Sequence, residues 1–274
     1  MAQEQGWDFG AGSGFTVNSK TAGIGVINGV AQGIYEESST QKAPLGQKLE
    51  FDDGRIFRYT KSAAAIGIAL VCGNDYSDGL LAETDDFSID STVAAGDTSF
   101  SLTGGGSEFA TSANAYAGSY IVFSDGGGAG EYYRIKGHGA ASSDKITFEL
   151  FDPLGTAPTA TTDIIIVGSP YGAVITADGT SVGADTDSWA VGIAPIAVSS
   201  GYYFWMQTRG VCAAKLDAGE TAAPHYGMEM VVSNAHDGQV EAKLDATDGY
   251  QVVGFNNSPT GDDNTYISLF ATFE

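Results

Sequence analysis

The chain has 274 residues, 43% of them hydrophobic, and its 12 Lys and Arg residues against 34 Asp and Glu residues give a formal net charge of −22. This hydrophobic share is too high for a disordered chain, and the length is sufficient for one large or two modest domains. An acidic surface of this kind repels phosphate backbones and anionic lipid headgroups. We therefore expect no nucleic acid and no membrane among the direct partners.

The composition indicates an all-β protein. Glycine accounts for 38 residues and is accompanied by many Ala, Ser, Thr and Asp residues, a combination typical of short strands joined by tight turns. Runs with helical periodicity and sufficient length are nearly absent. We expect a β-sandwich or barrel as the outer domain, formed by residues 36–85 and 171–274, with a second small β-barrel domain inserted at residues 86–170.

Residues 1–35 are expected to form an N-terminal arm or edge strand. Glycines alternate here with large apolar residues, and Trp7, Phe9 and Phe15 have little strand pattern around them. Because these three aromatics cannot form a core of their own, we expect them to contact another subunit or a partner protein, the alternative being that the arm folds back on its own domain. The first residues lack a basic and apolar leader pattern, so no secretory signal is expected.

The next elements are marked by turn residues and apolar runs. Asp52-Asp53-Gly54 separates two apolar runs and predicts a hairpin. A helix is possible for Ser62–Ala65, but a β-branched run and the glycines favour a strand over Ala63–Val71. The pattern of its block Ile66–Ala69, an apolar run interrupted by Gly, is repeated in Val191–Ala194 and, less closely, in Val253–Phe255. This repetition suggests that the three are equivalent strands. A glycine within each block predicts a bulge or a close backbone approach.

The segment 86–170 has a different sequence pattern, with short apolar runs at nearly regular spacing and turns rich in Gly and Asp. Strands are expected at Phe87–Val93, Thr98–Leu102, Tyr120–Phe123, Tyr132–Ile135, Ile146–Phe151 and Ile164–Val167.

The stretch Gly201–Cys212 predicts a strand that lies centrally in a sheet or between two layers. Its large apolar side chains occupy both faces of a period-2 pattern, and a strand that is apolar on both faces is buried on both. Gly201 and Gly210 bracket it and allow the chain to turn.

The sequence offers no convincing catalytic or metal-binding motif. Neither a nucleophile elbow nor a phosphate-binding loop is found, and Asn74–Gly79 is an incomplete calcium loop. Cys72 and Cys212 lie in or beside apolar runs, so we expect buried thiols. His138, His225 and His236 are expected in loops or at the surface. We therefore expect no enzyme activity, no cofactor and no metal.

Several segments resemble structural proteins of tailed bacteriophages. The likeness rests on Asn114–Val122, Gly128–His138 and Leu150–Leu154 of the middle segment, and on Phe51–Tyr59 and Gly201–Gly210 of the outer one. It covers roughly residues 47–255, and its motifs are structural rather than catalytic.

This resemblance implies a capsid decoration (cement) protein, synthesised in the host cytoplasm and located on the outer capsid surface of the virion. It implies binding to the major capsid protein across capsomers, with Trp7, Phe9 and Phe15 as candidate capsid or subunit contacts. Since such proteins often occupy threefold positions, it also implies a homotrimer. The alternative is a carbohydrate- or receptor-binding β module of a phage tail or fibre, with exposed aromatics as stacking platforms.

Overall fold

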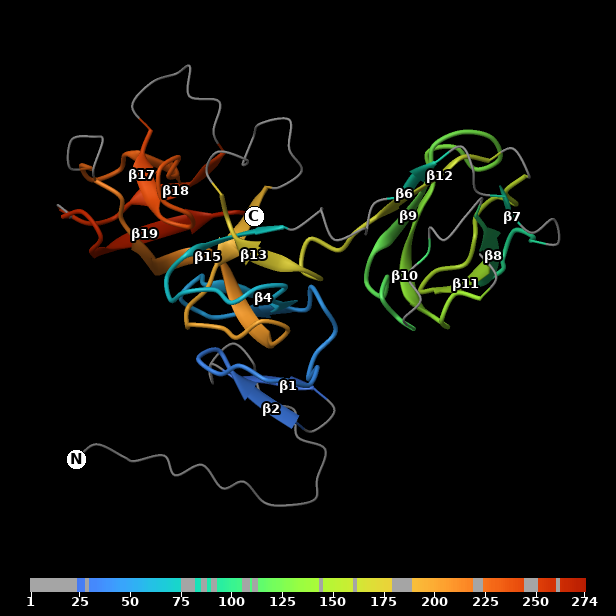
Figure 1. Ribbon diagram of the computed structural model, residues 1–274, viewed down its shortest axis with the longest axis horizontal. Coiled ribbons are helices and arrows are strands. Elements are labelled where there is room, and N and C mark those ends of the chain that lie inside the picture. Colours follow the sequence, from blue (N-terminus) through green and yellow to red (C-terminus); the bar gives the residue numbers. More distant parts are fainter. Residues whose placement is uncertain are drawn as a thin grey trace.

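The computed structural model describes residues 24–27, 30–74, 82–84, 88–89, 93–104, 109, 113–142, 145–159, 162–178, 189–218, 224–243, 251–259 and 262–274. These residues contain no helix and form a two-stranded hairpin, a seven-stranded sheet and a ten-stranded sheet. The strand pairings within the sheets are antiparallel, and the seven-stranded sheet forms a lobe of its own (Figure 1). The all-β prediction is confirmed.

The ten-stranded sheet makes up the outer domain. Its strands are β3 Lys48–Glu50, β4 Ile56–Lys61, β5 Val71–Asn74, β13 Val174–Thr176, β14 Ala190–Ile193, β15 Tyr203–Lys215, β16 Glu229–Val232, β17 Val240–Ala242, β18 Val252–Asn256 and β19 Tyr266–Thr272.

Strand β15 is the centre of this sheet, as the sequence predicts. Its first half pairs with β4 and β14 and its second half with β19. The run from Phe204 to Thr208 is buried on both faces, whereas Arg209, Val211 and Ala213 alternate outward in the second half. A strand covered on both sides has no free face for water, which explains the apolar run Phe204–Met206 at its start.

The second half of β15 helps to close a small barrel. The sheet runs in the order β15-β19-β18-β16-β17, and a parallel bridge from Leu216 to Val240 joins β17 back to the end of β15. Apolar side chains from these strands fill the interior, including Ala214, Met230 and Leu269. The prediction of a sandwich or barrel is thus met by a barrel at this end of the domain.

The hairpin around Asp52–Gly54 is confirmed. Strands β3 and β4 pair in register, and Gly54 takes a φ of 87° in the turn between them. Leu49 and Phe57 face each other across the hairpin and are buried. An isolated two-stranded hairpin is only marginally stable in water, so this packing against the rest of the domain stabilises it.

The prediction of a strand over Ala63–Val71 is wrong. Only Val71 belongs to a strand, the first residue of β5, while Ser62 and Ile66 make isolated bridges. Ala69 has a φ of 58°, which breaks any extended run through it. The chain therefore crosses the domain as a loop, and the Ile66–Ala69 block is not equivalent to the other two.

The glycines of those other two blocks do mark close backbone approaches. A Cβ on Gly192 would lie 2.8 Å from the Gln207 carbonyl oxygen, and one on Gly254 would lie 2.4 Å from that of Phe270. The register shifts between Ala190 and Gly192. Glycine is required at both positions because neighbouring backbone occupies the space of a side chain.

The seven-stranded sheet lies in sequence between β5 and β13, which pair with each other. Its strands are β6 Ala82–Thr84, β7 Ser88–Ile89, β8 Ser99–Thr103, β9 Tyr120–Phe123, β10 Tyr132–His138, β11 Lys145–Leu150 and β12 Ile164–Val167. The bounds of β9 and β12 coincide with those expected from the sequence. Strand β6 pairs with β12, so the sheet begins upstream of residue 86.

This inserted domain has a core of its own. Strand β10 pairs with β9 through Tyr132–Arg134 and with β11 through Ile135–His138, so it belongs to both halves of the sheet. The alternating strand β11 points Ile146, Phe148 and Leu150 into the core. In the described residues β6 and β7 stay at opposite edges and no pairing closes a barrel.

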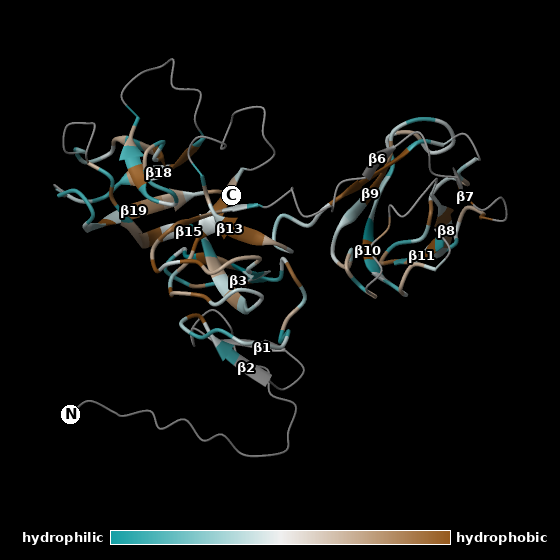
Figure 2. Cartoon of the chain, viewed as in Figure 1, coloured by the Kyte–Doolittle hydropathy of each residue, from teal (hydrophilic) through white to brown (hydrophobic). Residues whose placement is uncertain are grey.

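Part of the predicted arm docks on its own domain. Strands β1 Ile24–Ile27 and β2 Val30–Gly33 form a hairpin. The buried Gln32 accepts a bond from the Tyr59 hydroxyl at 2.7 Å through Oε1, and its carbonyl accepts one from Trp205 Nε1 at 3.1 Å. Brown segments, which mark hydrophobic residues, run through both lobes in Figure 2.

Candidate functional site

The outer domain carries an exposed apolar row across three neighbouring strands. Val211 of β15 lies opposite Phe270 of β19, which lies opposite Phe255 of β18. These side chains are 49%, 41% and 39% exposed. Side chains directly opposite on antiparallel strands lie close together on one face of the sheet, so the three form a strip, which we call the apolar row.

The strand pattern explains why the row exists. In β19 the residues Ile267, Leu269 and Ala271 point into the barrel, while Tyr266 and Phe270 point outward. Antiparallel strands with one face in the core normally place polar residues on the other, solvent-facing side. Because β19 has large apolar residues on both faces, those on its outer face remain exposed. Contiguous exposed apolar surface is typical of a protein-binding site.

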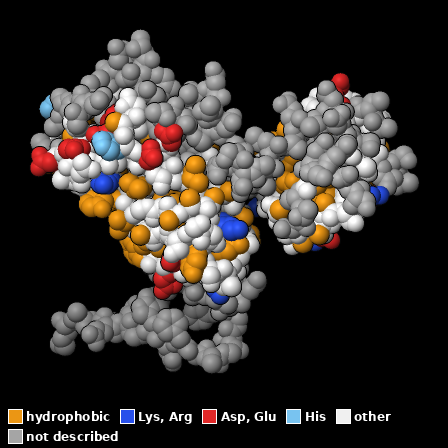
Figure 3. Space-filling view, in the orientation of Figure 1, with side chains coloured by type: hydrophobic (Ala, Val, Ile, Leu, Met, Phe, Trp, Pro, Cys, Tyr) orange, Lys and Arg blue, Asp and Glu red, His pale blue; other side chains and the backbone are white. Residues whose placement is uncertain are grey.

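A groove of about 340 Å³ continues the apolar row toward the loop that precedes β5. Ile68, which is 49% exposed, and Tyr266, which is 57% exposed, line this groove together with Val211. Figure 3 shows hydrophobic side chains gathered on the lower part of this lobe, below a zone rich in acidic side chains. The groove and the apolar row together form one surface, named here the apolar face.

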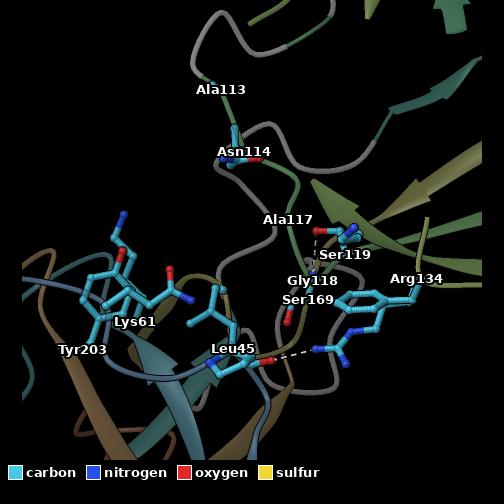
Figure 4. A pocket seen from close by; sticks show the side chains of 16 residues that line it. Leu45, Lys61, Ala113, Asn114, Ala117, Gly118, Ser119, Arg134, Ser169 and Tyr203 are labelled. Atoms are coloured by element: carbon cyan, nitrogen blue, oxygen red, sulfur yellow. Dashed lines mark hydrogen bonds between the residues drawn. The ribbon is translucent and has the colours of Figure 1, made fainter. Parts of the chain in front are cut away.

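A second concave feature lies between the two domains. It has a volume of about 450 Å³, and Lys61, Arg134 and Lys136 contribute the charged groups to its lining. In Figure 4, Lys61 and Tyr203 stand on one side and Arg134 on the other, with Leu45 between them. Arg134 Nη2 donates to the Leu45 carbonyl oxygen at 2.9 Å, a bond that joins the two domains.

Three residues of the outer domain have the composition of a catalytic triad without its geometry. Asp217 is buried and its Oδ2 accepts from the Ser233 hydroxyl at 2.5 Å and pairs with His236 Nδ1 at 3.0 Å. In a nucleophilic site the serine bonds to the imidazole and the carboxylate orients that imidazole. Here both bond to the carboxylate, so the cluster stabilises the loop that joins β16 to β17.

The expectation that all three histidines lie in loops or at the surface is wrong for His138. This residue ends β10 inside the inserted domain and is 5% exposed. Its Nε2 accepts from the Tyr116 backbone N–H at 2.9 Å, and Nδ1 donates to the Gly139 carbonyl at 2.6 Å. Burial lowers the pKa of His138, which matches a neutral ring with one donor and one acceptor.

Both cysteines are free thiols. Cys72 is fully buried, and Cys212 is partly buried in β15. Burial raises the pKa of the Cys72 thiol above its ordinary range and that of Cys212 to about 12. A thiol with a raised pKa is a poor nucleophile.

Among the described residues, no group of three or more His, Cys, Asp or Glu side chains is placed to hold a metal ion. The same part of the chain includes no helix with the length and hydrophobicity needed to span a bilayer. Asn74 ends β5, and the remainder of the incomplete calcium loop lies outside the described residues.

The contact residues expected from the sequence, Trp7, Phe9 and Phe15, also lie outside the described residues. The residues of the apolar row were not anticipated. A signal was present in Tyr266–Thr272, where large apolar residues occupy both alternating positions. The same pattern in Gly201–Cys212 indicates burial on both faces, so periodicity alone could not separate a covered face from an exposed one.

Comparison of the chain with protein-family models, with curated proteins and with solved structures finds no match in any of the three.

Proposed function

We propose that this protein is a non-enzymatic structural component of a bacteriophage particle, a decoration protein that binds the major capsid protein across capsomers on the outer surface. The resemblance of the segments around Tyr120, Tyr132 and Trp205 to phage structural proteins motivates the proposal. The observation that carries it is the apolar face, because an uncovered strip of Val211, Phe255 and Phe270 fits the core of a protein interface.

The surroundings of the apolar face support protein binding. Arg55, which is paired with Asp53, lines its groove, and Arg209 is exposed in β15 beside it, so charged side chains border the apolar surface. An apolar centre with a charged rim is the usual anatomy of a protein interface. Capsid symmetry would repeat this contact many times, so a modest interface can stabilise a shell.

The apolar row is tested by a triple variant, Val211→Thr, Phe255→Thr and Phe270→Thr, which keeps β-forming residues and removes the large apolar groups. We expect its affinity for emptied heads of the parent phage to fall by at least about tenfold, since central apolar anchors dominate interface energies. Co-sedimentation with heads measures this, and a circular-dichroism melt verifies the fold.

The matched control is Tyr132→Thr, an exposed aromatic of the inserted domain that is 69% accessible. It should bind heads as the wild type does. Full binding by the triple variant would rule out the apolar face as the contact, and failure of the wild-type protein to bind heads would rule out the decoration function.

The arm provides a second test of the same function. Deletion of residues 1–20, which include Trp7, Phe9 and Phe15, should leave both domains folded and abolish binding to heads if the arm anchors the protein. Unchanged binding after this deletion would mean that the arm does not bind the capsid and that the apolar face makes the contact.

A homotrimer belongs to the same proposal, because decoration proteins commonly occupy threefold positions of a shell. We expect light scattering coupled to size exclusion to give about three times the chain mass of 28.2 kDa. A monomeric mass at concentrations above about 50 µM would contradict the trimer, since stable interfaces of ordinary size bind well below that level.

The second candidate is a carbohydrate- or receptor-binding module of a tail or fibre. Tyr132 and Trp189, which are 69% and 50% exposed, favour it as stacking surfaces. Fractionation of virions separates the two functions, because a decoration protein follows the heads and a fibre module follows the tails.

A further inference from the structure

The cleft between the two domains gathers positive charge within an acidic molecule. Lys61, Arg134 and Lys136 line it, whereas none of the described lining residues is Asp or Glu. The whole chain has only 12 Lys and Arg residues against 34 acidic ones, so three cations at one cavity is a marked local concentration. Charge of one sign in a concave site focuses the field and attracts ions of the opposite sign.

Arg134 has an unused donor at this cleft. Its Nη2 bonds to the Leu45 carbonyl and its guanidinium carbon lies 5.1 Å from the centre of the Phe151 ring, which holds the group in place. Its Nε is buried and has no hydrogen-bond partner. A buried donor without an acceptor is costly, so this guanidinium has hydrogen-bonding capacity that the protein leaves unused.

The other two cations of the cleft are Lys61 of the outer domain and Lys136 of the inserted domain. Lys61 Nζ lies 5.8 Å from the centre of the Tyr203 ring on the outer domain. Lys136 Nζ has one acidic neighbour, Glu149, at 3.8 Å, and both side chains are more than half exposed, so water screens that pair strongly. The positive charge of the cleft is therefore only weakly compensated.

We propose that this cleft binds a small ligand with two or more phosphate-type oxyanion groups, held between Lys61 on the outer domain and Arg134 with Lys136 on the inserted one. The volume of about 450 Å³ suits a small molecule. Cations on opposite walls require a ligand with more than one anionic group. Such a ligand would connect the two domains and stabilise their arrangement, independently of any capsid contact.

The test uses the full-length protein and inorganic pyrophosphate at constant ionic strength. Titration calorimetry should show saturable binding of one pyrophosphate per chain. Lys61→Gln and Arg134→Gln should each weaken it at least tenfold. Because Arg134→Gln also removes the bond to Leu45, Lys61→Gln is the variant that keeps the domain contact intact.

Lys243→Gln is the matched control, since it removes the same charge from an ion pair with Glu229 in the outer domain, outside the cleft lining. It should bind pyrophosphate as the wild type does. An equal loss in this control, or no saturable binding by the wild type, would overturn the site. Citrate binding without pyrophosphate binding would overturn the phosphate assignment.

Discussion

At the scale of single residues, the polar contacts of this protein stabilise loops and strand ends. Glu274 shows this at the end of β19, where the Arg58 guanidinium contacts both of its oxygens, at 3.2 and 2.5 Å, and the Thr208 hydroxyl also donates to it. Burial would raise the pKa of Glu274, but the bonds from Arg58 and Thr208 outweigh it and hold that pKa below its ordinary value.

Glu274→Gln should therefore destabilise the outer domain by about 1 kcal/mol at pH 7, a size typical of a bidentate but partly exposed pair. A lowered pKa means that the stabilisation is present above pH 4.5 and is lost as the pH falls through the folded-state value. Thermal melts at pH 7 and at a series of pH values below 4.5 measure this, and the difference between the proteins should shrink as the pH falls. Glu229→Gln, in a longer and more exposed pair, is the control with little expected effect.

His236 gives the opposite pH dependence. The hydrogen bond to Asp217 raises the pKa of His236 above 6.5, so the bond stabilises the loop fully below that pH and fades as the pH rises through the folded-state pKa. His236→Ala should lower the melting temperature more at pH 5.5 than at pH 8.5. An equal effect of His236→Ala at both pH values would contradict the assignment.

At the scale of elements, the outer domain depends on two long strands that pass very close to their neighbours. Strand β15 links the hairpin of β3 and β4 to the barrel, and β19 lies between β15 and β18. Gly254 of β18 permits that close packing against β19. A Cβ added at this position would collide with backbone atoms of Phe270 and Ala271.

Gly254→Ala should destabilise the protein by about 1–3 kcal/mol, the range typical of overpacking. The clash is with the Phe270 carbonyl, which cannot rotate away as a side chain can. Chemical denaturation measures the change. Gly139→Ala has open space around its added methyl group and should be neutral within about 0.5 kcal/mol. A neutral Gly254→Ala would show that β18 and β19 can separate at little cost.

At the scale of the whole molecule, the two domains have separate cores. The apolar cluster of the inserted domain consists of residues from Ile89 to Ile166, while the clusters of the outer domain draw on residues before Asn74 and from Tyr171 onward. The described pairings between strands also stay within one domain or the other. A self-contained core is the main requirement for independent folding.

Residues 82–170 expressed alone should consequently form a folded, soluble β domain. The segment includes β6, which pairs with β12 and covers an edge that a fragment starting at residue 86 would leave open. Circular dichroism should show a β-type spectrum and one cooperative thermal transition. A disordered spectrum for this segment would mean that its fold requires the outer domain.

The sequence alone was sufficient for the class of the fold and for several strands of the segment 86–170. Period-2 alternation and turn residues predicted the all-β class, the bounds of β9 and β12, and the central position of β15. These features depend on local side-chain spacing and turn geometry, which a sequence displays directly.

Other features depend on contacts between distant segments, and the sequence could not show them. Ala63–Val71 has the composition of a strand, yet bonds of Ala69 to Ala194 and Lys215 hold it as a loop. His138 is buried because Phe148 and Tyr116 pack around it. The exposed apolar row and the basic interdomain cleft likewise exist only once β15, β18 and β19, and the two domains, are brought together in space. Packing between distant segments decides which apolar face is covered and which charged side chains come together. The spacing of residues along the chain contains no information on either point.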